Sequence, residues 1–468
     1  MKQFLSKVFL ALGNFAPARA NENPVCIVGA GPAGLSAAAQ LEIQGYRTVT
    51  FEKQSAVGGK CQAIYESGGF SPLGALIFTP PTYRESIKLL LDTGIGSVPF
   101  ISGEKWQYNS SSGMIWAKPP LPPQVTNLFM SEVKRYMDWW NKNFLLYNVS
   151  PGYRHGIPDE LTVPAAEWLA QNKYQTLQAA FIQSMVAYGY GDYREVPIIY
   201  MLQYLTPDVL MALLKVQQGV MVEIADFHKA FEMFSEKHIS GDIHLDTTIS
   251  DIDRTGEFPI IKYHGSHDSS QKSKTQTCSS IILAFPPTLS ALKAANLQLS
   301  QDELEVFDPV GTYSFYSGAV KMSTPHSMTF GAASSHPGLP PDATGDPVVF
   351  TKLHDDLDIA ITSSWGQYRG TLQKEEAYSR LKTTLSKFNM DPRDNTSIPL
   401  PVTDEDVLAF QENEYFPHFD PKKLREGYYE LFERLQGQQK TYYASGFNMF
   451  ELVEYAIRAG QDVARTYF

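Results

Sequence analysis

The chain has 468 residues, which is more than one hydrophobic core usually supports, so at least two consecutive or interleaved domains are expected. Hydrophobic residues make up 43% and charged residues 19%, a composition typical of a well-packed globular enzyme and not of a disordered chain. The formal net charge is -11 and no basic cluster is present, which argues against nucleic acid or an anionic membrane as the main partner.

The N-terminal residues 1–20 resemble a secretory signal peptide. Lys2 and Lys7 supply a positive segment, residues 8–16 an apolar core, and Ala18-Arg19-Ala20 a small-x-small cleavage site. An uncleaved anchor or a frayed N-terminal helix is the competing interpretation, although the apolar core is too short to span a bilayer. No later run of 18 apolar residues occurs, so we expect cleavage after Ala20, a secreted or secretory-pathway protein, and no stable membrane insertion.

Three sequons are consistent with export and predict a glycoprotein; they begin at Asn109, Asn148 and Asn395.

The chain has only three cysteines, which excludes a disulfide framework and leaves at least one thiol unpaired. Cys26 and Cys278 are expected to be core residues. Cys61 directly follows a glycine pair. The favoured interpretation is a buried, inert thiol, and the alternative is a covalent link to a flavin.

A dinucleotide-binding fingerprint follows the first apolar strand, Val25–Val28. Gly29 allows the tight turn, Gly31 lets the backbone approach a pyrophosphate, and Gly34 lets the next helix pack closely on the strand. The helix continues to Leu41. This strand, turn and helix predict a Rossmann-type nucleotide site.

The segment after the second strand, Thr48–Phe51, distinguishes FAD from NAD. Glu52 lies where a carboxylate accepts both hydroxyls of an adenosine ribose. Gly58, Gly59 and Lys60 follow in the spacing E-x5-G-G-[RK], which resembles the amine oxidase and phytoene desaturase superfamily of flavoproteins, where this loop wraps the FAD. The predicted cofactor is FAD, held by Gly29, Gly31, Gly34, Glu52, Gly59 and Lys60; no metal site is predicted.

We predict an α/β fold in which a Rossmann-type FAD-binding domain is interleaved with a mixed α+β substrate domain and a helical cap. The FAD-binding domain is assigned to residues 21–90, 219–287 and 409–468, the cap to 91–218 and the substrate domain to 288–408. Helical periodicity in 125–143, 164–171 and 174–188 carries the assignment of the cap.

One further cofactor contact is implied by the superfamily. A later strand there carries a β-branched residue whose backbone binds adenine, and Ile249 occupies the matching place; a plain core residue is equally compatible with the sequence.

The C-terminal segments 415–418, 435–437 and 441–446 resemble the β-cyclopiazonate dehydrogenase family of fungal FAD-dependent oxidoreductases, a branch of the amine oxidase superfamily. The resemblance implies oxidation coupled to ring closure of an indole-tetramic acid, with reoxidation by O2 or another acceptor. It also implies a turn at Ser445 and Gly446 and a last helix, 451–467, whose N-terminus stabilises negative charge on the reduced flavin. Phe450 is placed beside that turn as a cofactor contact.

The sequence also departs from the superfamily. The acid that commonly follows the alanine-glycine pair and contacts the ribityl chain is replaced by Gly446 or Phe447, and no lysine occurs in 310–320 to position a water at the flavin. These departures argue against amine oxidation by that particular arrangement.

Aromatic residues near the C-terminus are the substrate-site candidates. Tyr442 and Tyr443 precede the turn, and strand alternation allows one of them to face the site as a wall that attracts an amine or indole. His418 is a third candidate, with a satisfied structural histidine as the alternative. Tyr313 and Trp365 are further candidates from the second domain.

These features predict an FAD-dependent oxidoreductase that abstracts a hydride from an apolar, nitrogen-containing secondary metabolite. The alternatives are a flavin-dependent double-bond isomerase or desaturase acting on a polyene or fatty acid, and a non-catalytic binding protein that retains the fold.

Overall fold

The computed structural model describes residues 23–79, 82–101, 103–217, 221–267, 272–326, 328–334, 339–341 and 344–468. The predicted signal peptide, residues 1–20, lies outside these ranges, so its cleavage stays a prediction.

A five-stranded parallel sheet forms the nucleotide-binding half of the molecule. Its strands lie in the order β19 (Thr441–Tyr443), β13 (Ser280–Leu283), β1 (Val25–Val28), β2 (Thr48–Phe51) and β9 (Asp242–His244). β1 is paired in parallel on both sides, so its four residues are buried, as continuous apolar runs in parallel sheets usually are. The sheet therefore joins chain segments from both ends of the sequence, and the predicted Rossmann-type α/β fold is confirmed.

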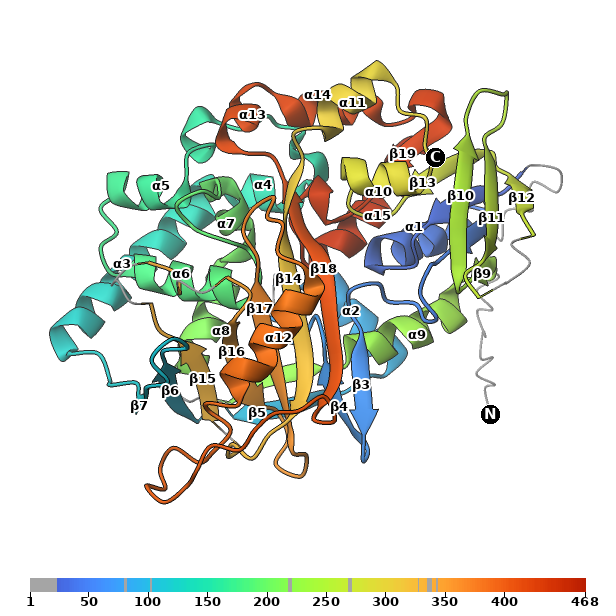
Figure 1. The fold of residues 1–468 in the computed structure, drawn as a ribbon. Helices are drawn as coiled ribbons and strands as arrows, with labels where there is room; N and C mark the ends of the chain where they lie inside the picture. The colour runs from blue at the N-terminus through green and yellow to red at the C-terminus, as the bar shows by residue number, and fades with distance from the viewer. Residues whose placement is uncertain are drawn as a thin grey trace, which may run out of the picture.

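Two helices pack side by side on one face of this sheet, α1 (Pro32–Ile43) and α15 (Val453–Tyr467) (Figure 1). Small residues allow the close approach: a Cβ at Gly460 of α15 would lie 2.1 Å from the carbonyl oxygen of Ala33. Two further helices extend this layer: α9 (Phe227–His238) packs against α1, and α2 (Arg84–Thr93) packs against α9 and α15. The first and last helices of the described chain thus form one layer.

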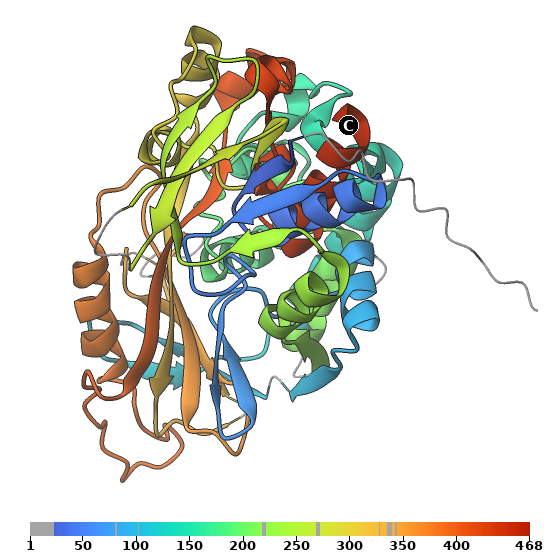
Figure 2. The same cartoon turned by 90° about the vertical axis from the view of Figure 1, so that its right-hand side faces the viewer.

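A three-stranded antiparallel sheet covers the other face. It comprises β10 (Thr247–Asp253), β11 (Ile260–Gly265) and β12 (Lys274–Thr277), drawn in yellow-green in Figure 2. The ring of Phe51 in β2 packs against Tyr263 in β11, with centroids 4.8 Å apart.

The second half is built on a seven-stranded mixed sheet. Its order is β18 (Val407–His418), β14 (Gly311–Lys321), β17 (Ile359–Trp365), β16 (Pro347–Lys352), β15 (Met328–Ala332), β6 (Glu104–Tyr108) and β7 (Ile115–Ala117). Two antiparallel two-stranded sheets complete the described strands: the hairpin of β3 (Ala63–Glu66) and β4 (Gly69–Pro72), and the pair of β5 (Ser97–Ile101) and β8 (Met221–Ala225), which lie far apart in the sequence.

The observed sheets correct two of the domain boundaries. Residues 91–118, assigned to the helical cap, contain β5, β6 and β7, and β6 pairs in parallel with β15. Residues 409–418, assigned to the FAD-binding domain, belong to β18 of the seven-stranded sheet. Both errors have one cause: the pairing partners lie far along the chain, as with Trp106 opposite Phe330, and local periodicity carries no sign of them.

The cap consists of α3 (Pro123–Asn143), α4 (Leu145–Val149), α5 (Ala165–Gln171), α6 (Leu177–Ala187), α7 (Ile198–Tyr204) and α8 (Pro207–Gln217). Every residue of α7 is buried.

Among the described helices, none alone is long and apolar enough to cross a membrane, and one bent pair, Ile198–Tyr204 with Pro207–Lys215, meets the length and composition required. The other helices are α10 (Leu289–Ala294), α11 (Gln301–Phe307), α12 (Lys374–Leu385), α13 (Pro421–Arg425) and α14 (Tyr428–Leu435).

Cys26 and Cys278 form a disulfide, with their Cα atoms 5.6 Å apart. Both residues are buried, as expected for core positions, but a bond between them was not predicted from the sequence.

The structure also corrects one of the predicted glycosylation sites. Asn148 is buried and its amide nitrogen donates to Gln203 and Tyr455, so no glycan can be attached there without breaking this packing.

Candidate active site

A cavity of about 840 Å³ lies where the nucleotide-binding sheet, the cap and the seven-stranded sheet meet. Residues at the carboxyl ends of β1 and β2 line it, as do residues of α8, β18 and the segment before α15. Its volume lies in the range usual for cofactor and ligand sites. Cavities at the carboxyl ends of parallel strands are where open α/β sheets bind ligands.

The turn between β1 and α1 has the geometry that its glycines predict. Gly29 has φ +108°, and a Cβ there would lie 2.8 Å from the carbonyl oxygen of Ala284. A Cβ on Gly34 would lie 1.9 Å from the carbonyl oxygen of Gly29, so Gly34 serves the packing of helix on strand and does not line the cavity. Gly31 caps α1 and faces the cavity; a Cβ there would meet only the Cα of Gly59, at 3.7 Å.

Glu52 directly follows β2, and its carboxylate lies on the cavity wall. Its Oε2 accepts a hydrogen bond from the backbone N–H of Ala30 (2.7 Å), and its Oε1 accepts one from Gln54 (2.9 Å). Each carboxylate oxygen has a second lone pair, so Glu52 can still accept hydrogen bonds from the hydroxyls of a ribose.

The Gly59 loop closes over the same turn. Gly59 has φ +56°, and a Cβ there would lie 2.9 Å from the Cα of Gly31. Lys60 follows on the cavity wall, and Gly74 packs against its backbone so closely that a Cβ would lie 1.9 Å from the carbonyl oxygen of Lys60. Ile249 of β10 also lines the cavity, beside an irregularity in the pairing of β10 with β11.

The C-terminal turn brings its residues to the cavity from the far end of the chain. Ser445 and Gly446 line it, and the hydroxyl oxygen of Ser445 accepts a hydrogen bond from the backbone N–H of Phe447. The last helix begins at Val453, two residues later than expected, because Glu451 and Leu452 precede it in non-helical conformation. Phe450 lies outside the lining and packs against the ring of Tyr204.

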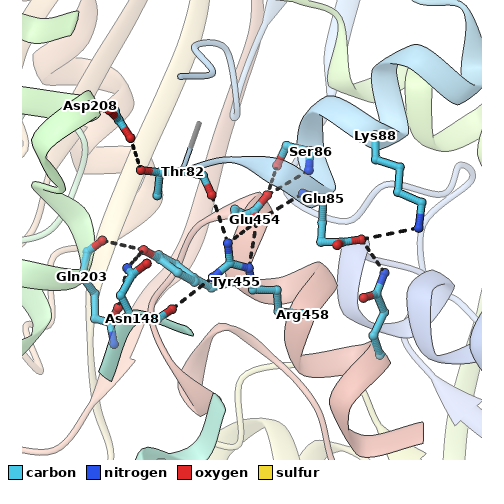
Figure 3. Close-up of polar contacts among 11 residues, drawn as sticks. Thr82, Glu85, Ser86, Lys88, Asn148, Gln203, Asp208, Glu454, Tyr455 and Arg458 are labelled. Carbon is cyan, nitrogen blue, oxygen red and sulfur yellow. Dashed lines mark hydrogen bonds and ion pairs between the residues drawn. The ribbon is translucent and has the colours of Figure 1, made fainter. Parts of the chain in front are cut away.

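The first turn of α15 is anchored by the polar network in Figure 3. The buried carboxylate of Glu454 accepts hydrogen bonds from the backbone N–H (2.8 Å) and hydroxyl (3.0 Å) of Ser86, and pairs with Arg458 at 2.6 Å. Arg458 also donates to the carbonyl oxygens of Thr82 and Asn148, both at 3.0 Å. The network fixes the N-terminus of α15 relative to α2 and the cap.

Part of the cavity wall is aromatic and apolar, and we call this part the aromatic chamber. Its walls come from the β4–α2 segment, the cap, α9, β14 and β18: Leu73, Ala75, Leu76, Ile77, Tyr83, Tyr188, Tyr190, Tyr204, Val209, Ala212, Leu213, Phe227, Phe315 and Tyr415. The hydroxyls of Tyr190 and Tyr415 are 3.3 Å apart. Burial raises the pKa of both tyrosines, so their hydroxyls are neutral donors at physiological pH.

The structure does not bring the three residues predicted as catalytic into this chamber. Tyr442 packs against Tyr467 and Phe468, and the hydroxyl of Tyr443 donates to Glu303 at 2.5 Å. Neither ring lines the cavity. The expectation that one of the two faces the site is therefore wrong, because α15 packs on one side of β19 and α11 on the other.

His418 is also outside the cavity lining. It is buried, stacks on Phe416 with centroids 4.2 Å apart, and donates from Nδ1 to the carbonyl oxygen of Phe416 (2.7 Å). Burial lowers its pKa to about 4, so the ring is neutral. His418 is therefore a hydrogen-bonded structural histidine, the alternative that the sequence left open. Tyr313 and Trp365 are likewise buried and lie outside the cavity lining.

Cys61 lies on the cavity wall as a buried free thiol. Burial, together with the charge of Glu451, raises its pKa to about 12. The thiol is therefore protonated and a poor nucleophile, in agreement with the favoured interpretation.

The residues present fit FAD. A single cavity is lined by three features that FAD requires. These are the carboxylate of Glu52 as an acceptor for ribose hydroxyls, the glycine-lined backbone cradle at the start of α1, and the aromatic chamber. Sequence reasoning found the first two from local motifs. It missed the aromatic chamber, because its residues come from separate elements and only the abundance of tyrosine, 25 in the chain, gave any signal.

Comparisons with known proteins show what the chain is similar to. Residues 27–93 match the family model of the NAD(P)-binding Rossmann-like domain. Over most of its length the chain is similar to two proteins: an uncharacterised protein of Acanthamoeba polyphaga mimivirus (24% identical, 91% of this chain and 89% of that protein) and an FAD-dependent oxidoreductase of Apiospora sacchari (23%, 91% and 88%). A polyenoic fatty acid isomerase of Ptilota filicina matches 40% of this chain and 42% of that protein at 26% identity.

Solved structures show the fold. A CLA-producing fatty acid isomerase from P. acnes superposes with a TM-score of 0.78 at 22% identity, covering 95% of this chain and 99% of that one. Putrescine oxidase superposes with a TM-score of 0.64 at 15% identity, covering 95% and 98%. The chain thus has the amine oxidase fold, a Rossmann-like dinucleotide-binding domain joined to a mixed-sheet substrate domain.

Proposed function

We propose that the protein is an FAD-dependent oxidoreductase that removes a hydride from an apolar, nitrogen-containing secondary metabolite. The observation that carries this proposal is the continuity of the cavity, which runs from Glu52 and the glycine cradle to the aromatic chamber. A cofactor bound along the cradle and a small molecule in the chamber would share one enclosed space.

FAD, when bound, supplies the electron-accepting ring system. Gly31 and Gly59 leave room for its diphosphate, and Glu52 accepts hydrogen bonds from its ribose. The anchored N-terminus of α15 contributes Leu452 and Val453 to the cavity wall. The aromatic chamber excludes water and orients the substrate.

The charges on the cavity wall favour a neutral or cationic substrate. The described lining residues include five glutamates, at 52, 412, 414, 451 and 454, and two lysines, Lys53 and Lys60. Lys60 is paired with Glu451 at 2.9 Å. Tyrosine faces attract cations, which supports an amine or indole nitrogen. An activity similar to the oxidative cyclisation catalysed by the β-cyclopiazonate dehydrogenase family is the finer proposal, with O2 or another oxidant as acceptor.

The visible spectrum of the purified protein, recorded before and after acid precipitation, tests the proposal. A flavin spectrum that leaves with the supernatant supports a non-covalent FAD enzyme. A colourless protein that takes up no added FAD would eliminate it and favour a non-catalytic binding protein. Anaerobic bleaching of the flavin by candidate amines and indoles then tests the substrate class.

A flavin-dependent double-bond isomerase or desaturase of a polyene or fatty acid is the second candidate. The TM-score of 0.78 with a fatty acid isomerase favours it. Redox balance separates the isomerase from the dehydrogenase and the desaturase, because only isomerisation leaves the flavin oxidised: anaerobic incubation with a polyunsaturated fatty acid that yields isomer while the flavin remains oxidised would eliminate the dehydrogenase.

We also propose that the protein resides in the secretory pathway or is secreted. The Cys26–Cys278 disulfide supports this, because such bonds persist mainly in oxidising compartments. Exposed Asn395 offers a glycan site that buried Asn148 does not. Expression in a eukaryotic host, followed by N-terminal sequencing of the medium and glycopeptide mass spectrometry, tests both parts; a protein retained in the cytosol with an intact N-terminus would overturn the proposal.

A further inference from the structure

Three tyrosine hydroxyls of the aromatic chamber have no hydrogen-bond partner among the described residues. Tyr83 directly precedes α2, Tyr188 directly follows α6, and Tyr204 is the last residue of α7, so three separate elements bring them to the cavity wall. Tyr83 is only 7% exposed and Tyr204 only 5%. Most polar groups buried to this extent in proteins are hydrogen-bonded, so three unpaired hydroxyls on one wall require a reason.

The three hydroxyl oxygens are accessible from the cavity. Fully enclosed polar atoms without a partner do occur among the described residues, such as Oγ1 of Thr79 on the same cavity wall, but no described tyrosine hydroxyl is one of them. A hydroxyl that is buried in the protein and open to a cavity can still form its hydrogen bond with the molecule that fills the cavity.

The three hydroxyls also lie close together. The rings of Tyr188 and Tyr204 pack edge to face, with their centroids 6.2 Å apart. Burial raises the pKa of Tyr204, and the neighbouring hydroxyls of Tyr188 and Tyr83 raise it further. Burial likewise raises the pKa of Tyr83 and of Tyr188. All three hydroxyls are therefore neutral at physiological pH, and each has a proton to donate.

The other two tyrosines of the chamber already have partners. The hydroxyl of Tyr190 donates to the backbone carbonyl oxygen of Glu451 at 3.0 Å and lies 3.3 Å from the hydroxyl of Tyr415. None of the described residues that form the chamber is a lysine or an arginine, and Lys60, elsewhere on the cavity wall, is paired with Glu451. The free donors are thus neutral phenols. They suit an uncharged oxygen better than a carboxylate, because a buried carboxylate without a cation is unfavourable.

We propose that Tyr83, Tyr188 and Tyr204 determine substrate specificity by donating hydrogen bonds to a carbonyl oxygen of the substrate. The inference rests on the proposed function and narrows it to apolar compounds that carry an uncharged carbonyl group, as in a ketone or an amide. The rest of the chamber wall is largely apolar, so the position of this oxygen decides which way round the substrate lies.

Binding of two matched probes to the flavin-loaded protein tests the proposal. 1-Indanone carries a carbonyl group that indane lacks on the same bicyclic frame, and the Kd of each is read from the change in the absorbance of the bound flavin. Wild type should bind 1-indanone about 10-fold more tightly than indane, because indane leaves the buried hydroxyls unpaired. Tyr83→Phe and Tyr204→Phe should each raise the Kd of 1-indanone about 3- to 10-fold and leave that of indane unchanged.

Two controls separate a ligand-binding role from a structural one. The hydroxyls bond to no described residue, so both variants should unfold at the same denaturant concentration as wild type, whereas loss of a paired hydroxyl would lower that concentration. Tyr147→Phe removes the hydroxyl of a cap tyrosine that does not line the cavity, and its Kd values for both probes should equal those of wild type.

Equal Kd values of the two probes in wild type, or Phe variants that bind 1-indanone as tightly as wild type does, would overturn the proposal. Variants that weaken only FAD binding would assign the hydroxyls to the cofactor, and variants that weaken only the binding of linoleate would assign them to a carboxylate; either result contradicts the proposal. A wild-type protein that takes up no flavin contradicts the proposed function, whereas a flavin-loaded protein that does not discriminate between the probes contradicts this inference alone.

Discussion

Gly31 and Gly59 touch at the entrance of the glycine cradle, so that a Cβ at position 59 would lie 2.9 Å from the Cα of Gly31. The contact is asymmetric. A Cβ at position 31 meets Gly59 only at 3.7 Å, and Gly31 has φ -77°, which any residue can adopt. Gly59 has φ +56°, where a side chain is strained. A substitution at Gly31 is therefore expected to affect cofactor binding alone, whereas a substitution at Gly59 is expected to strain the fold as well.

Replacing Gly31 by valine should leave the apoprotein folded and abolish flavin retention, because the side chain would occupy the space of the diphosphate. The melting temperature of the apoprotein should stay within about 2 °C of wild type, since substitutions that create no clash usually change stability by less than about 0.5 kcal/mol. Flavin absorbance per protein measures retention. Gly96→Val, at an open position with nothing within 4 Å of a Cβ, is the control and should stay yellow. A yellow Gly31→Val protein would refute the diphosphate assignment.

Glu52→Ala should weaken FAD binding and also destabilise the apoprotein. The substitution leaves the buried N–H of Ala30 without its acceptor, which costs about 1–3 kcal/mol of unfolding free energy. Chemical denaturation of the apoprotein measures the structural part, and FAD titration measures the ribose part. Equal FAD affinity in Glu52→Ala and wild type would contradict the placement of the adenosine, whatever the stability change.

The motifs that were predictable from sequence are those whose function depends on neighbours in the chain. Gly29, Gly31 and Glu52 act within one β-α-β unit, and their spacing alone places them on one edge of the sheet. The last strand and helix were recognised in the same way, with α15 starting two residues late because Glu451 and Leu452 remain extended or bent before it.

The substrate side was not predictable because its residues meet only through tertiary packing. Alternation along β19 predicted that Tyr442 and Tyr443 face opposite sides, which is observed, but it carries no information on what covers each side. Both sides are covered by helices, so the ring of Tyr443 is buried in the core and that of Tyr442 is half-buried against the end of α15. The aromatic chamber is instead formed by residues such as Tyr188 and Tyr204 from the cap and Tyr415 from β18.

Tyr443→Phe should reduce stability without changing catalysis. The lost hydroxyl donates to Glu303, a buried carboxylate that is also paired with Arg254 at 2.6 Å. Removing a hydrogen bond to a charged group should lower the free energy of unfolding by about 1.5–3 kcal/mol. Denaturant unfolding measures this effect, while flavin content and substrate-dependent flavin reduction should match those of wild type. A large loss of turnover with unchanged stability would restore Tyr443 as a substrate-site residue.

His418 should make the protein less stable as the pH falls. Its pKa is lowered by burial to about 4, below the value of about 6.5 in the unfolded chain, so between these values the unfolded state binds more protons. The contribution is fully present above about pH 6.5 and is lost as the pH falls towards 4, by up to about 3 kcal/mol. The unfolding free energies of wild type and His418→Gln, each measured at pH 7 and pH 4.5, give the loss of stability that His418 causes over this pH range. The variant should lose less stability over this range than wild type, and identical pH dependences would show that His418 is solvated.

Reduction of the Cys26–Cys278 bond should destabilise the nucleotide-binding sheet. The bond joins the first strand to the segment before β13 and closes a loop with a sequence separation of 252 residues, so its loss increases the freedom of the unfolded chain. Removing a native disulfide typically costs about 2–5 kcal/mol. The double variant Cys26→Ser with Cys278→Ser should therefore melt at a lower temperature than wild type, and dithiothreitol should lower the melting temperature of wild type but not of the double variant. Cys61→Ser, which removes the buried free thiol, is the control and should retain the response to dithiothreitol. If dithiothreitol leaves wild type unchanged and a thiol titration of the unfolded protein counts three free cysteines, the bond does not form and the argument for an oxidising compartment falls with it.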